Sequence, residues 1–135
     1  MTNRIQELTV NDVWRDEQDA WNNRSNYFVE MHNRDDRKAQ VTEFLSFLKD
    51  ENLLPPKDGC TLDIGCGVCD YALGLAREGH KATGIDLSDG MIRGAKQLAE
   101  SEGLNLSLYI APWSDETRRE LKWDKTFDLT YSIFC

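Results

Sequence analysis

The sequence has no long hydrophobic run and no excess of basic residues. Its apolar stretches fall far short of the roughly 20 residues that a membrane-spanning helix needs, and residues 1–10 lack the apolar core of a signal peptide. We therefore expect a cytoplasmic protein with no membrane partner. The formal net charge of −8 also argues against a nucleic-acid partner, because binding along a phosphate backbone requires a basic face.

Cysteine is scarce as well, with four residues, which are too few for a disulfide scaffold in a chain of 135. Cys66 and Cys69 form a C-x-x-C pair, which can indicate a zinc or redox site. Zinc would need two more ligands, and no second C-x-x-C or histidine pair follows. We expect no metal and interpret both cysteines as small residues that fill a tight loop, with metal or redox use as the alternative.

The first part of the chain, residues 1–56, reads as a helical segment. Residues 1–11 carry no strong pattern, and a helical stretch is expected to begin at Asp12. The clearest helix is predicted over residues 35–51, because apolar residues recur there on one helical face. That face is formed by Val41, Phe44, Leu45 and Leu48.

The second part, residues 57–135, alternates predicted strands with predicted helices. The strands are expected near residues 61–64, 81–86, 104–110 and 126–134, and the helices near 70–78, 89–102 and 115–121. Such alternation is typical of an α/β domain with a mostly parallel sheet between helices. The chain is long enough to form one domain from both parts.

The first of these strands leads into a glycine-bearing turn, Asp63-Ile64-Gly65-Cys66-Gly67, and then into a helix. A strand that turns into a helix through small residues brings backbone N–H groups close to a ligand above the turn. Asp86 ends the next strand about 20 residues after Gly65, where such units place an acid on ribose hydroxyls. The sequence therefore predicts a nucleotide-type site at this edge of the sheet.

The turn resembles the first motif of class I S-adenosylmethionine-dependent methyltransferases, [DE]-x-G-x-G-x-G, with Cys69 in place of the third glycine. The resemblance implies a Rossmann-like three-layer α-β-α fold with about four strands in the order 3-2-1-4. It also implies S-adenosyl-L-methionine as cofactor and S-adenosyl-L-homocysteine as product. The cofactor-binding residues that it implies are Asp63, Gly65, Cys66, Gly67, Asp86, Leu87, Met91 and Trp113, with a packing role in the core as the alternative for Met91.

The resemblance implies a methyltransferase that acts on a small-molecule acceptor, although the sequence shows no candidate for a catalytic base. In similar proteins the N-terminal segment closes over the cofactor, and Trp21 and Tyr27 are the candidates here, against a simple packing role. His32 is expected on the surface. The alternative function is a catalytically incomplete module that binds the cofactor or a protein partner.

A nicotinamide dinucleotide domain is the other α/β alternative. It requires G-x-G-x-x-G, and the third glycine position counted from Gly65 and Gly67 is occupied by Asp70, whose charge would face a pyrophosphate. The family's later strands are absent from the chain, so the fourth strand is expected to be a sheet edge. Because such an edge invites pairing, we expect a homodimer joined through or near residues 126–135.

Overall fold

The computed structural model of the chain describes residues 3–8, 12–123 and 126–133. Within these residues five parallel strands form one sheet with the order β1-β4-β3-β2-β5. The strands are β1 (Arg4–Glu7), β2 (Cys60–Ile64), β3 (Lys81–Asp86), β4 (Leu106–Ile110) and β5 (Leu129–Tyr131). The helices are α1 (Asp12–Asn22), α2 (Ser25–Met31), α3 (Asp35–Asp50), α4 (Asp70–Arg77), α5 (Asp89–Glu102) and α6 (Asp115–Leu121).

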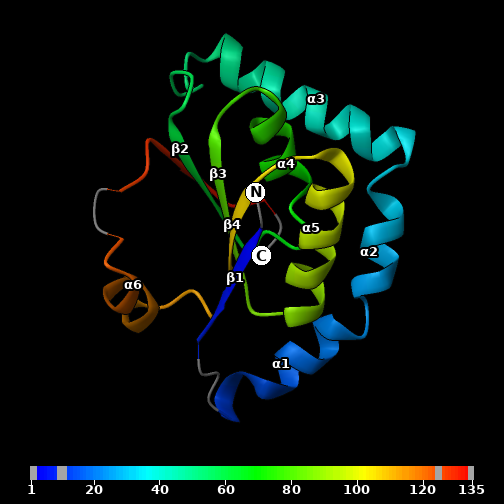
Figure 1. Cartoon of the computed structure of the whole chain (residues 1–135), viewed down its shortest axis with the longest axis vertical. Helices are drawn as coiled ribbons and strands as arrows, with labels where there is room; N and C mark the ends of the chain where they lie inside the picture. Colours follow the sequence, from blue (N-terminus) through cyan, green and yellow to red (C-terminus); the bar gives the residue numbers. More distant parts are fainter. Residues whose placement is uncertain (1–2, 9–11, 124–125, 134–135) are drawn as a thin grey trace.

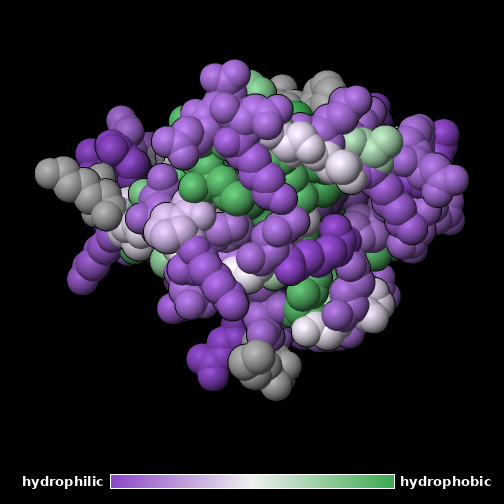
Figure 2. Space-filling model, turned by 90° about the horizontal axis from the view of Figure 1, so that it is seen from above, coloured by the Kyte–Doolittle hydropathy of each residue, from purple (hydrophilic) through white to green (hydrophobic). Residues whose placement is uncertain are grey.

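Helices lie on both sides of the sheet, so the predicted three-layer α/β architecture is confirmed. In Figure 1, α4 and α5 lie on one side of the sheet and α6 lies on the other. Helix α3 packs on α4, and α1 and α2 pack on α5, so the N-terminal helices form an outer layer on the α4/α5 side. Figure 2 looks onto the α3 end, where most outer residues are hydrophilic and apolar residues show mainly in recesses.

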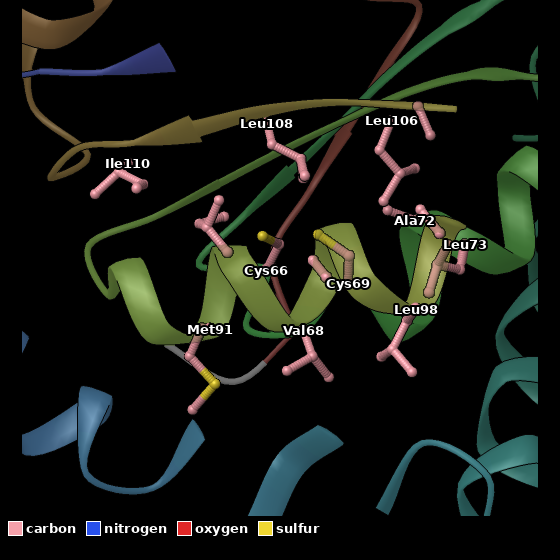
Figure 3. Close-up of a cluster of buried hydrophobic side chains, with 14 residues drawn as sticks. Cys66, Val68, Cys69, Ala72, Leu73, Met91, Leu98, Leu106, Leu108 and Ile110 are labelled. Carbon is pink, nitrogen blue, oxygen red and sulfur yellow. The ribbon is translucent and has the colours of Figure 1, made fainter. Parts of the chain in front are cut away.

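The larger hydrophobic core lies between the sheet and the pair α4 and α5. Leu106, Leu108 and Ile110 alternate along β4 on the face that points toward the helices (Figure 3). They meet Cys66 and Cys69 of the glycine turn, and all five side chains are buried. The turn is therefore held from below by the core of the domain.

A smaller core lies on the opposite face, where α6 is the covering helix. Leu62 of β2 and Ile85 of β3 are buried there. Trp123 covers them, with its ring edge-on to Tyr109 at a centroid distance of 4.7 Å and to Phe127 at 5.3 Å. Aromatic side chains thus cover much of the part of this sheet face that the short helix α6 does not reach.

The order predicted for the four strands of residues 57–135 corresponds to β4-β3-β2-β5 and is confirmed. The prediction missed β1, which adds a fifth strand beside β4. Its four residues contain one apolar side chain, Ile5, so no alternation marks it as a strand. Asn3 fixes its register instead: the side chain donates to the Leu104 carbonyl (3.2 Å) and accepts from the Leu106 N–H (2.7 Å).

Strand β5 is shorter than predicted, because it pairs with β2 only over Leu129–Tyr131. At its two ends side chains add hydrogen bonds to β2, beside the main-chain bond from the Asp128 N–H to the Cys60 carbonyl at 2.8 Å. The Asp128 carboxylate accepts from the Cys60 N–H at 2.8 Å, and the Ser132 hydroxyl donates to the Ile64 carbonyl at 2.8 Å. Residues 134–135 of the predicted strand lie outside the described residues.

No helix in the described ranges is long and apolar enough to cross a lipid bilayer.

Candidate functional site

The turn between β2 and α4 has the backbone shape that its glycines predict. Gly65 and Gly67 have φ angles of 68° and 57°, in the left-handed region that glycine enters without steric cost. The N–H groups of Gly65 and Cys66 donate to the Ile85 carbonyl at 2.9 and 3.0 Å, which ties the turn to β3. The turn is therefore pinned at the carboxyl ends of two neighbouring strands.

Cys69 occupies the position of the third glycine and adopts a glycine-like backbone, with φ at 67°. Its side chain is buried, as is that of Cys66, and both sulfurs face the space that a Cβ on Gly84 would fill. Burial raises the pKa of both thiols, so they remain protonated and apolar in character. Among the described residues no group of three or more His, Cys, Asp or Glu is arranged to hold a metal ion.

Asp86 lies at the carboxyl end of β3 and faces the turn. One of its carboxylate oxygens accepts from the Gly67 N–H at 2.8 Å, and the other accepts from the Ser88 N–H at 2.9 Å. Burial raises the pKa of Asp86, and the backbone N–H groups of Ser88, Gly67 and Leu87 oppose that shift. Each oxygen retains a lone pair beyond these bonds, so the carboxylate can accept further hydrogen bonds from hydroxyl groups.

A cavity of about 630 Å³ opens above the turn. We call its lower wall the floor, formed by residues 63–71 and 85–91, and its upper wall the roof, formed by α1, α2 and the start of α3. In Figure 1, α1 crosses the end of the sheet at which β3 passes into α5. The roof residues are Trp14, Glu17, Trp21, Phe28 and Arg37.

All eight residues predicted to bind a cofactor lie on the wall of this cavity. Trp113 forms part of its side, half exposed, and stacks on Trp123 at a centroid distance of 6.4 Å. Of the two roof candidates, Trp21 lines the cavity whereas Tyr27 does not. Tyr27 lies outside, edge-on to Phe28, which takes the inward position.

Two charged side chains in the cavity have buried polar atoms with no hydrogen-bond partner. They are the Oδ2 atom of Asp63 on the floor and the Nε atom of Arg37 on the roof. Burial raises the pKa of Asp63 well above its usual range, and the nearby Tyr131 hydroxyl opposes the shift. One oxygen of a carboxylate and one nitrogen of a guanidinium thus lack partners, and they provide recognition groups for a ligand that carries both charges.

Arg37 was missed by the sequence analysis. It lies in the predicted helix of residues 35–51, but no spacing in the sequence relates it to the turn. Its Nη1 atom lies 3.8 Å from the Asp70 carboxylate at the start of α4, which explains its inward position. The only sequence signal for a binding role of Arg37 is its position on the first turn of an otherwise amphipathic helix.

Polar side chains of α1 fix the roof to the floor. The Gln18 side chain donates to the Leu87 carbonyl at 3.1 Å. Asn22 accepts from the Ser88 hydroxyl at 2.5 Å and from the Gly90 N–H at 3.0 Å, and it donates to the Asp89 carboxylate. We call this group of contacts the Asn22 clamp.

The prediction that His32 lies on the surface is wrong. Its side chain is buried at the C-terminal end of α2, with Nδ1 at 2.6 Å from the Asp70 carboxylate and Nε2 at 3.1 Å from the Glu102 carboxylate. These two partners lie on α4 and α5. A polar residue that follows an apolar cluster is usually exposed to solvent. His32 is buried because α2, α4 and α5 meet around its side chain.

The sequence matches the methyltransferase domain family over residues 61–135, more than half of the chain. The chain belongs to this family, and the predicted resemblance to S-adenosylmethionine-dependent methyltransferases is confirmed.

Individual relatives differ in the molecule on which they act. The 23S rRNA (uracil(1939)-C(5))-methyltransferase RlmD of Marinomonas posidonica is 32% identical over 71% of this chain and 23% of its own length. The 2-heptyl-1-hydroxyquinolin-4(1H)-one methyltransferase of Mycobacteroides abscessus is 37% identical over 53% of this chain and 32% of its own length. The chain thus spans between 14% and 32% of the length of these and similar curated relatives.

A solved structure from a study titled "Conversion of a Disulfide Bond into a Thioacetal Group during Echinomycin Biosynthesis" has the same fold. It is 33% identical to the chain, with a TM-score of 0.55, and the similarity covers 64% of this chain and 34% of that one. The similar part is again a portion of a longer protein.

Proposed function

We propose that the chain binds S-adenosyl-L-methionine in the cavity between floor and roof and takes part in methyl transfer to a small-molecule acceptor. The observation that carries this proposal is the position of Asp86. Its carboxylate lies on the cavity wall beside the glycine turn, with both oxygens oriented by backbone N–H groups. A carboxylate held in this way accepts two hydrogen bonds from a vicinal diol such as that of ribose.

The remaining cavity residues fit the other parts of this cofactor. The amino-acid end of S-adenosylmethionine carries an ammonium and a carboxylate, which match the partnerless Asp63 oxygen and Arg37 nitrogen. Leu87, Met91 and Trp113 supply apolar surface for the adenine ring. The donor set is that of a zwitterionic nucleoside, and Asp70 argues against a dinucleotide pyrophosphate.

When bound, S-adenosylmethionine supplies a methyl group activated by its positively charged sulfur. The chain's own contribution is to bind and orient the two reactants, because in-line displacement depends chiefly on proximity and alignment. Trp14, Trp21 and Phe28 of the roof close the cavity from above and limit the access of water. No residue of the cavity is assigned as a general base.

A small-molecule acceptor is favoured by charge and by the cavity wall. The chain has a net charge of −8, and the roof above the turn is largely aromatic. The negative charge would repel a phosphate backbone, whereas an aromatic wall suits a small apolar acceptor. The curated relatives include both a ribosomal RNA methyltransferase and a quinolone methyltransferase, so acceptor assays should test both classes.

The direct test is calorimetric titration with S-adenosylhomocysteine. We expect micromolar binding to the wild-type chain and a loss of at least about 100-fold in the Asp86→Ala variant, because two charge-assisted hydrogen bonds disappear. Asp115→Asn removes an exposed carboxylate from α6 and serves as the matched control with unchanged affinity. An absence of binding at millimolar ligand would overturn the proposal.

The alternative function is a module that binds the cofactor without catalysis. A second measurement distinguishes it from an active methyltransferase. Cys69 in the glycine position favours this alternative. Incubation with methyl-labelled S-adenosylmethionine and pools of small-molecule or RNA acceptors measures transfer directly. Binding without transfer to either pool supports the module, whereas transfer identifies the acceptor class.

We also propose that the outer edge of β5 pairs with a second copy of the chain. Within the described residues β5 has one neighbour, β2, so its other side has no strand beside it. Light scattering at several concentrations should give a dimer mass, with slow amide exchange in residues 129–131. A monomer at all concentrations, or rapid exchange in a dimer, would contradict pairing at this edge.

A further inference from the structure

The contacts of His32 form a charge network that reaches the ligand cavity. His32 contacts Asp70 and Glu102, and the Glu102 carboxylate is bound by Arg77 at 2.6 and 2.9 Å. The second carboxylate oxygen of Asp70 lies 3.8 Å from Arg37, which lines the cavity together with Asp70. A titratable residue at the end of α2 is thereby connected to the charged part of the binding site.

The geometry around the imidazole ring favours its protonated form. Each ring nitrogen has a carboxylate oxygen within hydrogen-bonding distance, at 2.6 and 3.1 Å. A neutral imidazole has one N–H donor, so one of its nitrogens would face a carboxylate with a lone pair, whereas an imidazolium donates to both. The guanidinium of Arg77, 3.4 Å from Nε2, is the positive group that opposes this charge.

The charge on His32 determines how strongly Asp70 attracts Arg37. The cavity is lined by four carboxylates, three on the floor and that of Glu17 on the roof, and by one guanidinium. An imidazolium at 2.6 Å offsets the charge of Asp70, which leaves Arg37 available to an anionic group of a ligand. With a neutral imidazole, Asp70 competes for Arg37 and repels that anionic group.

We propose that His32 is a positioning residue for ligand binding: in its charged form it engages Asp70 and thereby keeps Arg37 directed at the carboxylate of the ligand. This proposal rests on the proposed function, because it assigns Arg37 to the amino-acid end of the cofactor. The affinity for that end is highest while His32 is protonated and declines as it loses its proton.

The direction of the pH effect follows from the same contacts. The hydrogen bond to Asp70, aided by Glu102, raises the pKa of His32 above 6.5 against the opposing effect of burial. Affinity should therefore be retained through pH 6.5 and should decrease as the pH rises through the raised pKa. By reciprocal linkage, a bound carboxylate ligand raises the pKa of His32 further.

The test measures S-adenosylhomocysteine affinity by calorimetry from about pH 5.5 to 9 for the wild type and the His32→Gln variant. The ratio of the two dissociation constants cancels the titration of the ligand itself. We expect the variant to bind about tenfold more weakly at low pH and equally at high pH, the change that corresponds to one pKa unit. His80→Gln, at the other histidine of the chain, is the matched control with an unchanged profile.

A second ligand separates this mechanism from general loosening of the roof. 5′-Methylthioadenosine lacks the amino-acid end, so its affinity should not depend on the charge of His32. An equal dependence for both ligands would overturn the proposal. The Asn22→Ala variant loosens the other end of the roof, so it should weaken both ligands at every pH.

Nuclear magnetic resonance of the wild-type chain provides a test that needs no variant. The chain has two histidines, so the imidazole signal of His32 can be followed through a pH titration with and without S-adenosylhomocysteine. We expect its pKa to rise by about one unit on binding. Binding with an unchanged pKa would overturn the role of His32 alone, whereas an absence of binding would overturn the proposed function.

Discussion

The floor and the roof of the cavity are encoded in different ways. The floor is made by a strand, a turn and a helix that follow one another in the sequence, and Gly65 and Gly67 fix the backbone at positive φ. The roof is made by helices whose position depends on side-chain contacts with residues far along the chain. Asn22 and His32, for example, are bound by residues on α5 and α4.

The floor and the roof should therefore respond differently to substitutions. The floor is buried and closely packed, so its geometry should survive changes elsewhere in the molecule. The roof is held at one end by the Asn22 clamp and at the other by the network of His32. We expect floor variants to affect stability most strongly and roof variants to affect ligand affinity at nearly constant stability.

The largest effect is expected from Gly84→Ala, which challenges the packing of the floor. A Cβ at this position would lie 2.5 Å from the Cys69 sulfur and 2.8 Å from that of Cys66. We expect a loss of about 3 kcal/mol in the free energy of unfolding, because overpacking displaces the turn. Urea unfolding followed by circular dichroism measures this loss.

A double-mutant cycle tests the cause of that loss. Cys69→Ala removes the nearer of the two sulfurs, so Gly84→Ala should cost less in that background, although the Cys66 sulfur remains. Additive effects of the two changes would show that the Cys69 sulfur is not the obstacle.

The sequence predicted the floor well because its signals are local. A short motif specifies the turn, and the spacing from Gly65 to Asp86 specifies which strand end lies opposite. The roof and β1 could be predicted less well, since their placement depends on long-range contacts. Asn3 must reach Leu104 and Leu106 before Arg4–Glu7 becomes a strand.

The same limit applies to individual charges of the site. Asp63 was predicted because it belongs to the motif, whereas Arg37 and the burial of His32 depend on where α3 and α2 dock. Propensity and periodicity identify helices but do not determine which of their polar residues turn inward. Recognition of the roof residues therefore required the three-dimensional structure.

A smaller effect, on affinity rather than stability, is expected from Arg37→Gln in the roof. The change removes the guanidinium that we assign to the ligand carboxylate, and we expect S-adenosylhomocysteine to bind about tenfold more weakly. The unfolding midpoint should change little, because the buried Nε atom has no partner to lose and the ion pair of Nη1 with Asp70 is long, at 3.8 Å. Arg34→Gln, at an exposed residue just before α3, is the matched control with unchanged affinity.

A large loss of stability in Arg37→Gln would contradict the contrast between floor and roof. It would mean that Arg37 holds the roof in place through Asp70, with no special role toward the ligand. Equal losses of affinity in both arginine variants would instead point to a general effect of net charge.

The smallest effect is expected from Asp63→Asn in the floor. This change should raise stability and lower ligand affinity at the same time. Burial raises the pKa of Asp63 well above its usual value of 3.8. Between the ordinary pKa of Asp63 in the unfolded chain and its raised pKa in the folded chain, the folded chain binds more protons at this residue than the unfolded chain does. Over that pH range Asp63 therefore makes the free energy of unfolding fall as the pH rises. Asparagine carries no charge and removes this contribution.

We therefore expect Asp63→Asn to be more stable than the wild type at pH 7 by about 1 kcal/mol, with the difference shrinking toward about pH 4. Affinity for S-adenosylhomocysteine should fall at the same time, because the ammonium loses its carboxylate partner. Urea unfolding at several pH values and calorimetry measure the two quantities. Lower stability of the variant at pH 7 would mean that the Asp63 carboxylate stabilises the fold, and the floor would then be built for packing rather than for a ligand.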